Sequence, residues 1–330
     1  MNDKVSIVIP AHNAEKTVLR AIQSIHDSLT GIIPYEVIVV ENGSTDLTWN
    51  VLENQQIETI TLLRSSAGVS NARNIGMAAA DGKWLMFVDA DDRLETDCGK
   101  YLKEQAERDV DLCLFGYSKG KQSIFPELKD EETVEQIRVK MLEFPTKYMT
   151  VWAKLFRRDI IEKNKLEFDD ALRLSEDSDF VIQYTKYCRK ITYCEHLLYR
   201  YETNSASVMH VFDGGKLLDY ARAMECTQKK LIDEPESIRN AYWQYVLTHF
   251  HVAMVNETFS TANKESFLQK KLDMKKAAEM PIFREAIQKT RGQKQSRANR
   301  ILGVLLRKKC YLCAAGIYEI RALQKSRSAD

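Results

Sequence analysis

The amino-terminal half of the chain alternates short apolar segments with segments of helical character. The strand-like segments are residues 5–9, 35–40, 57–63, 84–88 and 111–117. Between them, residues 15–29 and 69–80 read as helices, the first with apolar residues at helical spacing. Strands that alternate with helices are joined by crossovers, which place them parallel in one sheet. The sequence therefore predicts an α/β fold with a mainly parallel, Rossmann-like sheet flanked by helices.

The fourth strand-like segment ends abruptly in acidic residues. The apolar run 84–88 is followed by Asp89, Asp91 and Asp92. A run of this kind is typical of a buried strand, and the acids would lie at its carboxyl end, where open α/β sheets bind ligands. Carboxylates this close repel one another unless a cation holds them, and Mg²⁺ is often held by carboxylates together with substrate phosphates. The segment indicates a site for a metal ion and a diphosphate; the alternative is an acidic turn that caps the next helix.

The composition is ordinary for a folded protein of 330 residues with a net charge of +1. This charge gives no general attraction to nucleic acid, and no apolar run is long enough to span a membrane. The first strand begins at Val5 with no basic segment or cleavage site before it, which argues against secretion, and the seven cysteines are scattered. These features predict a cytoplasmic location with reduced thiols.

The carboxyl-terminal part has a different character. The pattern predicts one domain over residues 1–213 and a helical region over residues 214–330. Between residues 287 and 330 there are eleven Lys or Arg residues and two acids. Basic amphipathic helices can lie on anionic membrane surfaces, and they also pack on their own domain or on a second copy. Peripheral contact with the inner face of the cell membrane and homo-oligomer formation both stay open here.

Three further polar segments follow strands or begin a helix: residues 10–13, 41–46 and 67–76. Each can converge with residues 89–92 on one edge of the sheet. This order and spacing resemble the family 2 glycosyltransferases, strongly over about residues 4–120 and more loosely to about residue 210. The resemblance implies the GT-A fold and the transfer of a sugar from a nucleotide donor.

The resemblance also implies roles for individual residues. Asp89 would contact the ribose or the sugar, and Asp91 would bind Mg²⁺ or Mn²⁺, which offsets charge on the diphosphate. Arg73 would contact the base or the diphosphate. Glu41 stands where the family usually has an aspartate that accepts a hydrogen bond from uracil, so a UDP-sugar is less firmly implied. The donor-binding set implied in this way is Pro10, Ala11, Asn13, Glu41, Ser70, Arg73, Asp89, Ala90 and Asp91.

A second acidic cluster, Glu176, Asp177 and Asp179, leads into a helical segment. Acids in a first helical turn are favoured by the helix dipole, so a simple capping role is one interpretation. The resemblance implies that Asp177 is the general base, which takes the proton from the acceptor hydroxyl as that oxygen attacks the anomeric carbon. Attack opposite the diphosphate would invert the configuration of that carbon. Glu176 would assist, or would simply be solvated.

Two more segments hold candidate residues. Trp152 and Lys154 lie in a run similar to one in many relatives and would contact the acceptor or a phosphate; alternatively, the run begins a packed helix. His210 is a candidate third metal ligand, with an ordinary loop residue as the alternative.

The leading hypothesis is a metal-dependent, inverting glycosyltransferase that uses a nucleotide sugar, with UDP as the favoured nucleotide. The acceptor would be a growing surface glycan, lipid-linked or polymeric, as in capsule, exopolysaccharide or teichoic acid assembly. One alternative is a sugar nucleotidyltransferase, but the Gly-rich signature expected after the first strand is replaced by residues 10–13. Another is a non-catalytic nucleotide-sugar or glycan-binding subunit, which the presence of Asp89, Asp91 and Asp177 disfavours.

Overall fold

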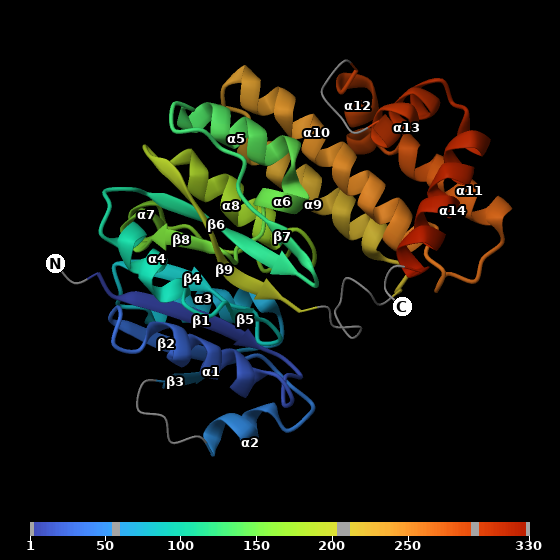
Figure 1. Cartoon of the computed structure of the whole chain (residues 1–330). Helices are drawn as coiled ribbons and strands as arrows, with labels where there is room; N and C mark the ends of the chain where they lie inside the picture. Colours follow the sequence, from blue (N-terminus) through green and yellow to red (C-terminus); the bar gives the residue numbers. More distant parts are fainter. Residues whose placement is uncertain (1–2, 55–59, 203–211, 292–296, 328–330) are drawn as a thin grey trace. The chain divides into compact units, whose positions relative to one another are not determined.

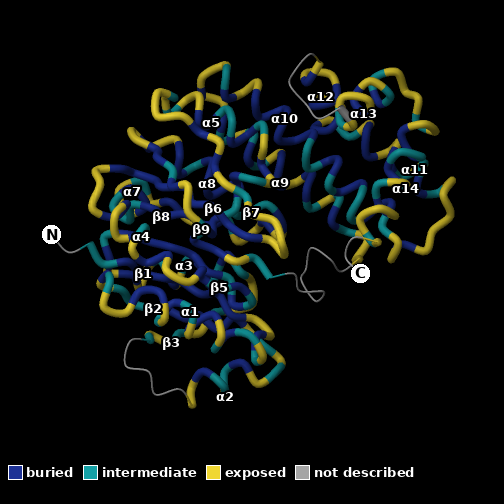
Figure 2. The backbone as a smooth tube through the Cα atoms, viewed as in Figure 1, coloured by how far each residue is buried: buried dark blue, intermediate teal, exposed yellow. Residues whose placement is uncertain are grey.

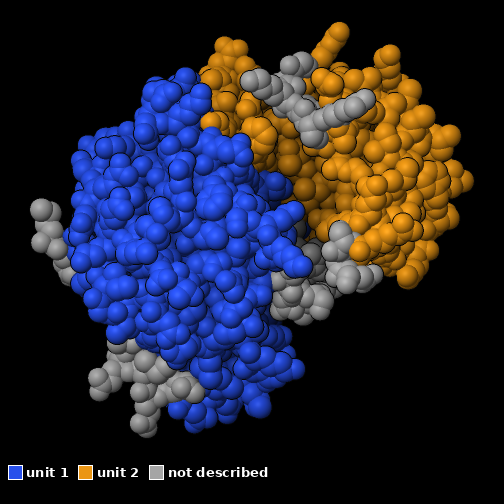
Figure 3. All heavy atoms as spheres, viewed as in Figure 1, with its two compact units in different colours: residues 1–138, 146–204 blue, residues 139–145, 205–330 orange. Residues whose placement is uncertain are grey.

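The computed structural model describes residues 3–54, 60–202, 212–291 and 297–327. The chain divides into two compact units, which Figure 3 distinguishes by colour. Unit 1 comprises residues 1–138 and 146–204, and unit 2 comprises residues 139–145 and 205–330. The domain boundary expected from the sequence at residue 213 stays a prediction. Each unit is described by itself.

A twisted sheet forms the centre of unit 1 (Figure 1). The strands are β1 (Val5–Ala11), β2 (Tyr35–Glu41), β3 (Ile60–Arg64), β4 (Trp84–Phe87), β5 (Arg93–Leu94), β6 (Leu112–Lys119), β7 (Gln122–Ile124), β8 (Lys154–Arg157) and β9 (Ile191–Tyr201). Over the described residues their order is β3-β2-β1-β4-β8-β6-β9-β5, and β7 pairs with β6. Strands β1 to β4 are parallel to one another, as are β6 and β9, whereas β5, β7 and β8 pair antiparallel. The predicted mainly parallel α/β fold is confirmed.

The strand order fixes where a ligand can bind. Strand β1 lies between β2 and β4, with Ala11 opposite Glu41 and Val8 opposite Phe87. The chain runs from β1 outward through β2 and β3, then returns to the other side of β1 as β4. Such a reversal opens a crevice at the carboxyl ends of the central strands. The polar segments after β1, β2 and β4 all reach this edge.

Helices cover both faces of the sheet. In and beside unit 1 they are α1 (Val18–Leu29), α2 (Thr48–Glu53), α3 (Val69–Ala79), α4 (Cys98–Ala106), α5 (Val134–Glu143, which crosses the division), α6 (Pro145–Tyr148), α7 (Arg158–Asn164) and α8 (Glu176–Lys186). Apolar residues of α1 and α4 share a buried cluster with Ile7 and Ile9 of β1. On the opposite face α3 approaches β1 so closely that a Cβ at Gly76 would overlap Val8. Strands β1 and β4 are buried along their whole length (Figure 2).

An aromatic cluster attaches α8 to the sheet. Phe180 stacks on Phe168 with ring centroids 4.1 Å apart, and both rings meet Phe87 edge-on. Phe180 lies one helical turn after Asp177, and Phe87 lies two residues before Asp89. Packing of the apolar rings therefore brings the first turn of α8 to the carboxyl end of β4.

Unit 2 is helical in its described residues. Its helices are α9 (Lys216–Lys230), α10 (Glu236–Ala253), the π-helix η1 (Met254–Thr258), α11 (Phe267–Glu279), α12 (Pro281–Lys289), α13 (Arg297–Arg307) and α14 (Tyr311–Arg327). Helix α10 lies in the core, where Phe250 packs on Phe283 with centroids 5.2 Å apart and His251 hydrogen-bonds Tyr318. Among the described residues, no helix combines the length and apolar character needed to cross a membrane.

Candidate active site

Arg73 lies at the centre of the candidate site. It is on α3 and only 3% exposed. Its Nη1 donates hydrogen bonds to Asp177 and, at 3.1 Å, to Glu176, while Nη2 donates to Asp89 at 3.3 Å. The fold thus joins the acids after β4 and the acids that begin α8 through one guanidinium. Four residues selected from the sequence meet here.

Negative charge exceeds positive charge at this site. Burial, reinforced by neighbouring carboxylates, raises the pKa of Asp89 to about 6 and the pKa of Glu176 to about 8, although Arg73 opposes both shifts. Burial and the charge of Asp89 likewise raise the pKa of Asp92 to about 8. Glu176 and Asp92 thus keep their protons near neutral pH, which indicates a site with too little positive charge. A bound cation would supply it.

The turn after β4 is held by Tyr199 of β9. The Tyr199 hydroxyl accepts a hydrogen bond from the Asp89 amide (3.1 Å) and donates one to the Asp92 carboxylate (2.6 Å). Asp92 also accepts from the Glu202 amide at 2.7 Å. Asp92 is only 1% exposed, and its hydrogen bonds stabilise the turn, whereas Asp91 is partly exposed. Asp89 and Asp91, unlike Asp92, are therefore acids of this turn that a ligand can reach.

The donor-side candidates lie at the ends of β1 and β2. Pro10 and Ala11 are buried, as is Ala90 in the turn after β4. The Glu41 carboxylate accepts from the Ser44 amide at 2.5 Å, which closes the turn after β2. Asn13 has a left-handed backbone (φ 50°).

Asn13 also links two of these segments, because its Oδ1 accepts from the Thr45 amide at 2.8 Å. Ser70, on α3, donates from Oγ to the carbonyl of Asp169 at 3.2 Å. Backbone and side-chain hydrogen bonds thus fix the segments after β1 and β2 relative to each other.

The residues after β4 suit a partly hydrated hard cation. Within the described ranges no group of three or more His, Cys, Asp or Glu side chains gathers as a ready metal cage. Mg²⁺ and Mn²⁺ commonly take one or two carboxylates from the protein and the rest of their ligands from phosphates and water. Asp91, with the acid-rich surroundings described above, fits that pattern. His210 lies outside the described residues.

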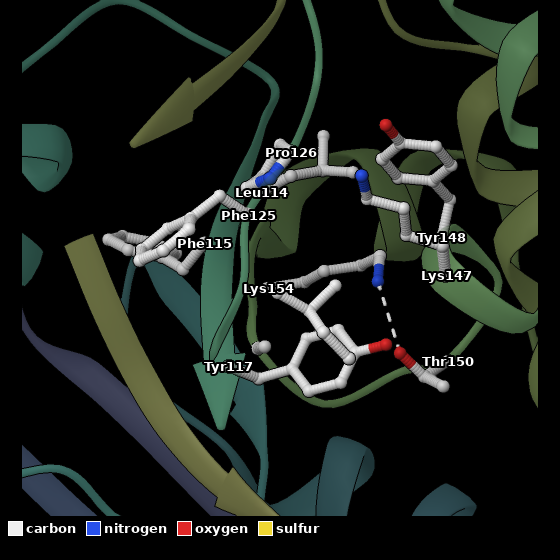
Figure 4. Close-up of a pocket in the computed structure, with 11 residues that line it drawn as sticks. Leu114, Phe115, Tyr117, Phe125, Pro126, Lys147, Tyr148, Thr150 and Lys154 are labelled. Carbon is white, nitrogen blue, oxygen red and sulfur yellow. Dashed lines mark hydrogen bonds between the residues drawn. The ribbon is translucent and has the colours of Figure 1, made fainter. Parts of the chain in front are cut away.

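Lys154 points into a small cavity of unit 1 (Figure 4). The cavity is lined in part by Tyr117, Tyr148 and Thr150, and the Lys154 ammonium donates a long hydrogen bond of 3.4 Å to Thr150 Oγ1. Burial lowers the pKa of Lys154 to about 7, and the charge of Asp177 opposes this shift. Lys154 is therefore a buried amine that is only partly protonated at neutral pH, within electrostatic reach of Asp177.

Trp152 is 7% exposed and stacks on Tyr199 with centroids 4.8 Å apart. Its ring also meets Tyr117 edge-on at 4.7 Å. This packing favours the structural interpretation of Trp152, and contact with a sugar stays a prediction. The run does not begin a helix: residues 154–157 form β8, and α7 starts only at Arg158.

Comparison with known sequences gives the family. The sequence profile of the glycosyl transferase family 2 matches residues 6–164. These residues form a family 2 glycosyltransferase domain. The chain is 24% identical over 301 residues to the putative glycosyltransferase EpsH of Bacillus subtilis, an alignment that covers 87% of this chain and 86% of EpsH.

Solved structures give the fold. The amino-terminal part of TarS from Staphylococcus aureus, solved in complex with UDP-GlcNAc, superimposes with a TM-score of 0.67 at 20% identity and covers 98% of this chain and 92% of that one. The mannosyltransferase PcManGT of Pyrobaculum calidifontis, in complex with GDP-Man and Mn²⁺, gives 0.52 at 15% identity, covering 97% and 86%. By sequence the chain aligns with 35% of the length of TarS, a poly(ribitol-phosphate) beta-N-acetylglucosaminyltransferase, at 27% identity over 61% of this chain. The GT-A fold expected from the sequence is confirmed.

The sequence did not predict two features of the candidate site. The first is the role of Tyr199 in shaping the acidic turn, which no local pattern signals because the two segments are distant in the chain. The second is left-handed backbone at Ala153 (φ 54°) and Ser175 (φ 64°), directly before Lys154 and Glu176. Non-glycine residues in this conformation are strained and tend to occur at functional sites.

Proposed function

We propose that this glycosyltransferase transfers a sugar, with inversion, from a nucleotide donor bound at the carboxyl ends of β1, β2 and β4 to a hydroxyl of a glycan acceptor. One observation carries the proposal: a single buried guanidinium contacts Asp89, on the donor side, and Asp177, at the start of α8. Strands β2 and β4 both pair in parallel with β1, so the polar segments that follow these three strands lie at the same edge of the sheet. This arrangement supports the same donor position.

Asp177 is the proposed general base. Its carboxylate accepts the proton of the acceptor hydroxyl while the oxygen forms a bond to the anomeric carbon and the bond from that carbon to the diphosphate breaks. The acceptor must approach from the face opposite the leaving group, so alignment of the three groups contributes much of the rate. The partly exposed position of Asp177 beside the donor-side acid supports this assignment.

Asp91 is the proposed protein ligand of Mg²⁺ or Mn²⁺. When bound, the cation would offset charge on the nucleoside diphosphate as it leaves. The Mn²⁺ present with GDP-Man in the related mannosyltransferase structure supports a divalent cation, and so does the excess of acids around Arg73. Whether His210 adds a ligand stays a prediction.

UDP is the proposed nucleotide. Support comes from the TarS structure with UDP-GlcNAc. At the end of β2, Glu41 keeps a carboxylate where the family usually has aspartate, although its side chain is one methylene longer. The Glu41 carboxylate already accepts from the Ser44 amide, leaving its other oxygen near Arg64 Nε at 3.9 Å. The other proposed donor contacts are Pro10, Ala11, Asn13, Ser70, Asp89 and Ala90.

The proposed acceptor is a cell-surface glycan, polymeric or lipid-linked, by analogy with the poly(ribitol-phosphate) named as the substrate of TarS. We propose in addition that the end of unit 2 contacts an anionic membrane surface. The sequence holds no acid between residues 286 and 318, and around α13 it exposes Ile301, Val304 and Leu312 next to Lys308 and Lys309. Cytoplasmic location stays a prediction.

The membrane proposal has a direct test. Vesicles that contain phosphatidylserine should sediment the protein, and binding should weaken as salt rises, because screening reduces the attraction of the basic residues. Replacing Lys308 and Lys309 together with Gln should reduce binding, and phosphatidylcholine vesicles serve as the control. Equal binding to both vesicle types at all salt concentrations would contradict the membrane contact.

The catalytic proposal is tested by Asp177→Asn. Turnover of UDP-GlcNAc with a glycan acceptor should fall by about 10²-fold or more, because the base is lost. Donor affinity, measured by calorimetry with Mn²⁺, should stay nearly unchanged. Asp170→Asn, on an exposed part of the preceding loop, is the matched control. Near-normal turnover in Asp177→Asn would refute the assignment, and retention of the anomeric configuration would refute the in-line mechanism.

A further inference from the structure

Arg73 is surrounded by protein groups to an unusual degree. Its Nη1 donates to Asp177 and Glu176, and its Nη2 donates to Asp89. The guanidinium carbon also lies 5.2 Å from the ring centroid of Phe168. The buried Nε has no hydrogen-bond partner. Both hydrogens of Nη1 are therefore directed at acids of α8, which leaves few donors of this side chain for a bound nucleotide.

The acids around Arg73 differ in the charge they carry. Burial lowers and three carboxylates raise the pKa of Arg73, with a net upward shift, so the guanidinium stays charged. Glu176 holds its proton to about pH 8. At neutral pH the positive charge is thus shared mainly by Asp177 and Asp89. A buried cation with paired acids resists displacement, because breaking the pair leaves an uncompensated charge.

We propose that Arg73 is the positioning residue of the general base: its guanidinium holds the Asp177 carboxylate at a fixed place relative to Asp89. This inference rests on the proposed function. It gives Arg73 a role different from the contact with base or diphosphate that the family resemblance implies. The contact between Nη1 and Asp177 is shorter than the contact between Nη2 and Asp89.

The test compares Arg73→Gln and Arg73→Lys in the full-length protein. Arg73→Gln removes the positive charge that lowers the pKa of the neighbouring acids Asp89 and Glu176, so the acidic limb of the kcat/KM profile should move to higher pH. We expect kcat to fall by about 10²-fold through misplacement of the base, with the donor KM changed by less than about threefold. Arg73→Lys keeps a charge but lacks the fork, so it should restore the pH limb in part and kcat only weakly.

Arg157 offers a matched control. It too bridges several carboxylates, contacting Asp109 at 2.9 Å and Asp159 at 3.3 Å, but these acids lie outside the candidate site. Arg157→Gln should leave the pH profile unchanged, whatever its effect on stability. A shift of the acidic limb in this variant equal to that of Arg73→Gln would contradict the specific role of Arg73.

Two outcomes would overturn the inference while leaving the proposed function intact. One is a large rise in donor KM in both Arg73 variants with an unchanged pH profile, which would make Arg73 a donor contact. If neither variant folds, the guanidinium nitrogen resonances decide: Arg73 Nη signals, slowed by the carboxylates, should be resolved in the wild type and lost in Asp177→Asn. Identical signals in the two proteins would be the second contrary outcome. The proposed function would be refuted by a different result, namely near-normal turnover in Asp177→Asn.

Discussion

At the scale of single residues, the sequence identifies acids better than it identifies what surrounds them. Asp89, Asp91 and Asp177 stand out because each ends a strand or begins a helix. The triple contact of Arg73 could not be read in this way, because its partners come from two distant segments that only the packed fold brings together. The same holds for Tyr199, whose hydroxyl fixes the acidic turn.

Asp91→Asn tests the proposed metal ligand. A neutral amide is a poorer ligand for a hard cation. The increase in UDP affinity that Mn²⁺ produces should therefore be at least about tenfold smaller in the variant, and transfer should be abolished. Calorimetric titration of UDP with and without Mn²⁺ measures the effect, with Asp170→Asn as the control. Superimposable titration curves for Asp91→Asn and the wild type would remove Asp91 from the metal site.

Ala153→Gly tests backbone strain beside Lys154. At φ 54° the Ala153 Cβ crowds the backbone, and glycine accepts this conformation freely. The variant should be more stable by up to about 1 kcal/mol, as seen by denaturant unfolding. Ala21→Gly, at a buried position within α1, should instead lose about 1 kcal/mol or more. A loss of stability at residue 153 comparable to that at residue 21 would show that the strain is not relieved.

At the scale of helices and strands, the parallel half of the sheet was predictable, whereas its antiparallel additions were not. Strands β1, β2 and β4 are continuous apolar runs because both faces are buried. By contrast, β8 is four residues long and carries Lys154 and Arg157, so its pattern resembles the start of a helix. Tertiary pairing with β4 and β6, which the local sequence does not encode, decides its conformation.

Phe180→Ala tests whether the aromatic cluster positions α8. The side chain is fully buried between Phe168 and Phe156, so truncation should destabilise unit 1 by about 3–5 kcal/mol. Turnover should fall further than stability alone explains, since the first turn of α8 loses its anchor. Denaturant unfolding gives the stability, and kcat should be measured at a temperature below the unfolding transition. Phe267→Ala, at an exposed position of α11, is the control. Unaltered kcat in the folded variant would separate the cluster from catalysis.

At the scale of the whole molecule, the two units should respond differently to acid. Burial lowers the pKa of His251 to about 3 and that of His249 to about 4, from an ordinary value of 6.5. Below about pH 6.5 these two histidines bind protons in the unfolded state but not in folded unit 2. The free energy of unfolding of unit 2 should therefore fall as the pH drops toward 4. In unit 1 the raised pKa of Glu176 acts in the opposite direction, since its contribution is lost as the pH rises through 8.

Hydrogen exchange, corrected for intrinsic rates, resolves this difference between the units. Peptides from α10 should lose protection between pH 7.5 and pH 5, and His251→Asn should reduce that loss because Asn does not titrate. His196→Asn, at an exposed histidine of unit 1, should leave the pH dependence of α10 unchanged. Equal loss of α10 protection in His251→Asn and wild type would assign the acid sensitivity to other groups.

The central claim is that the acids after β4 and the acid of α8 serve one reaction centre. A crystal structure with Mn²⁺ and a non-hydrolysable analogue of UDP-GlcNAc tests it most directly. The anomeric carbon should lie between the diphosphate, held on the Asp91 side, and the Asp177 carboxylate, with room for an acceptor hydroxyl beside that carboxylate. A sugar bound with its anomeric carbon directed away from Asp177 would contradict the account.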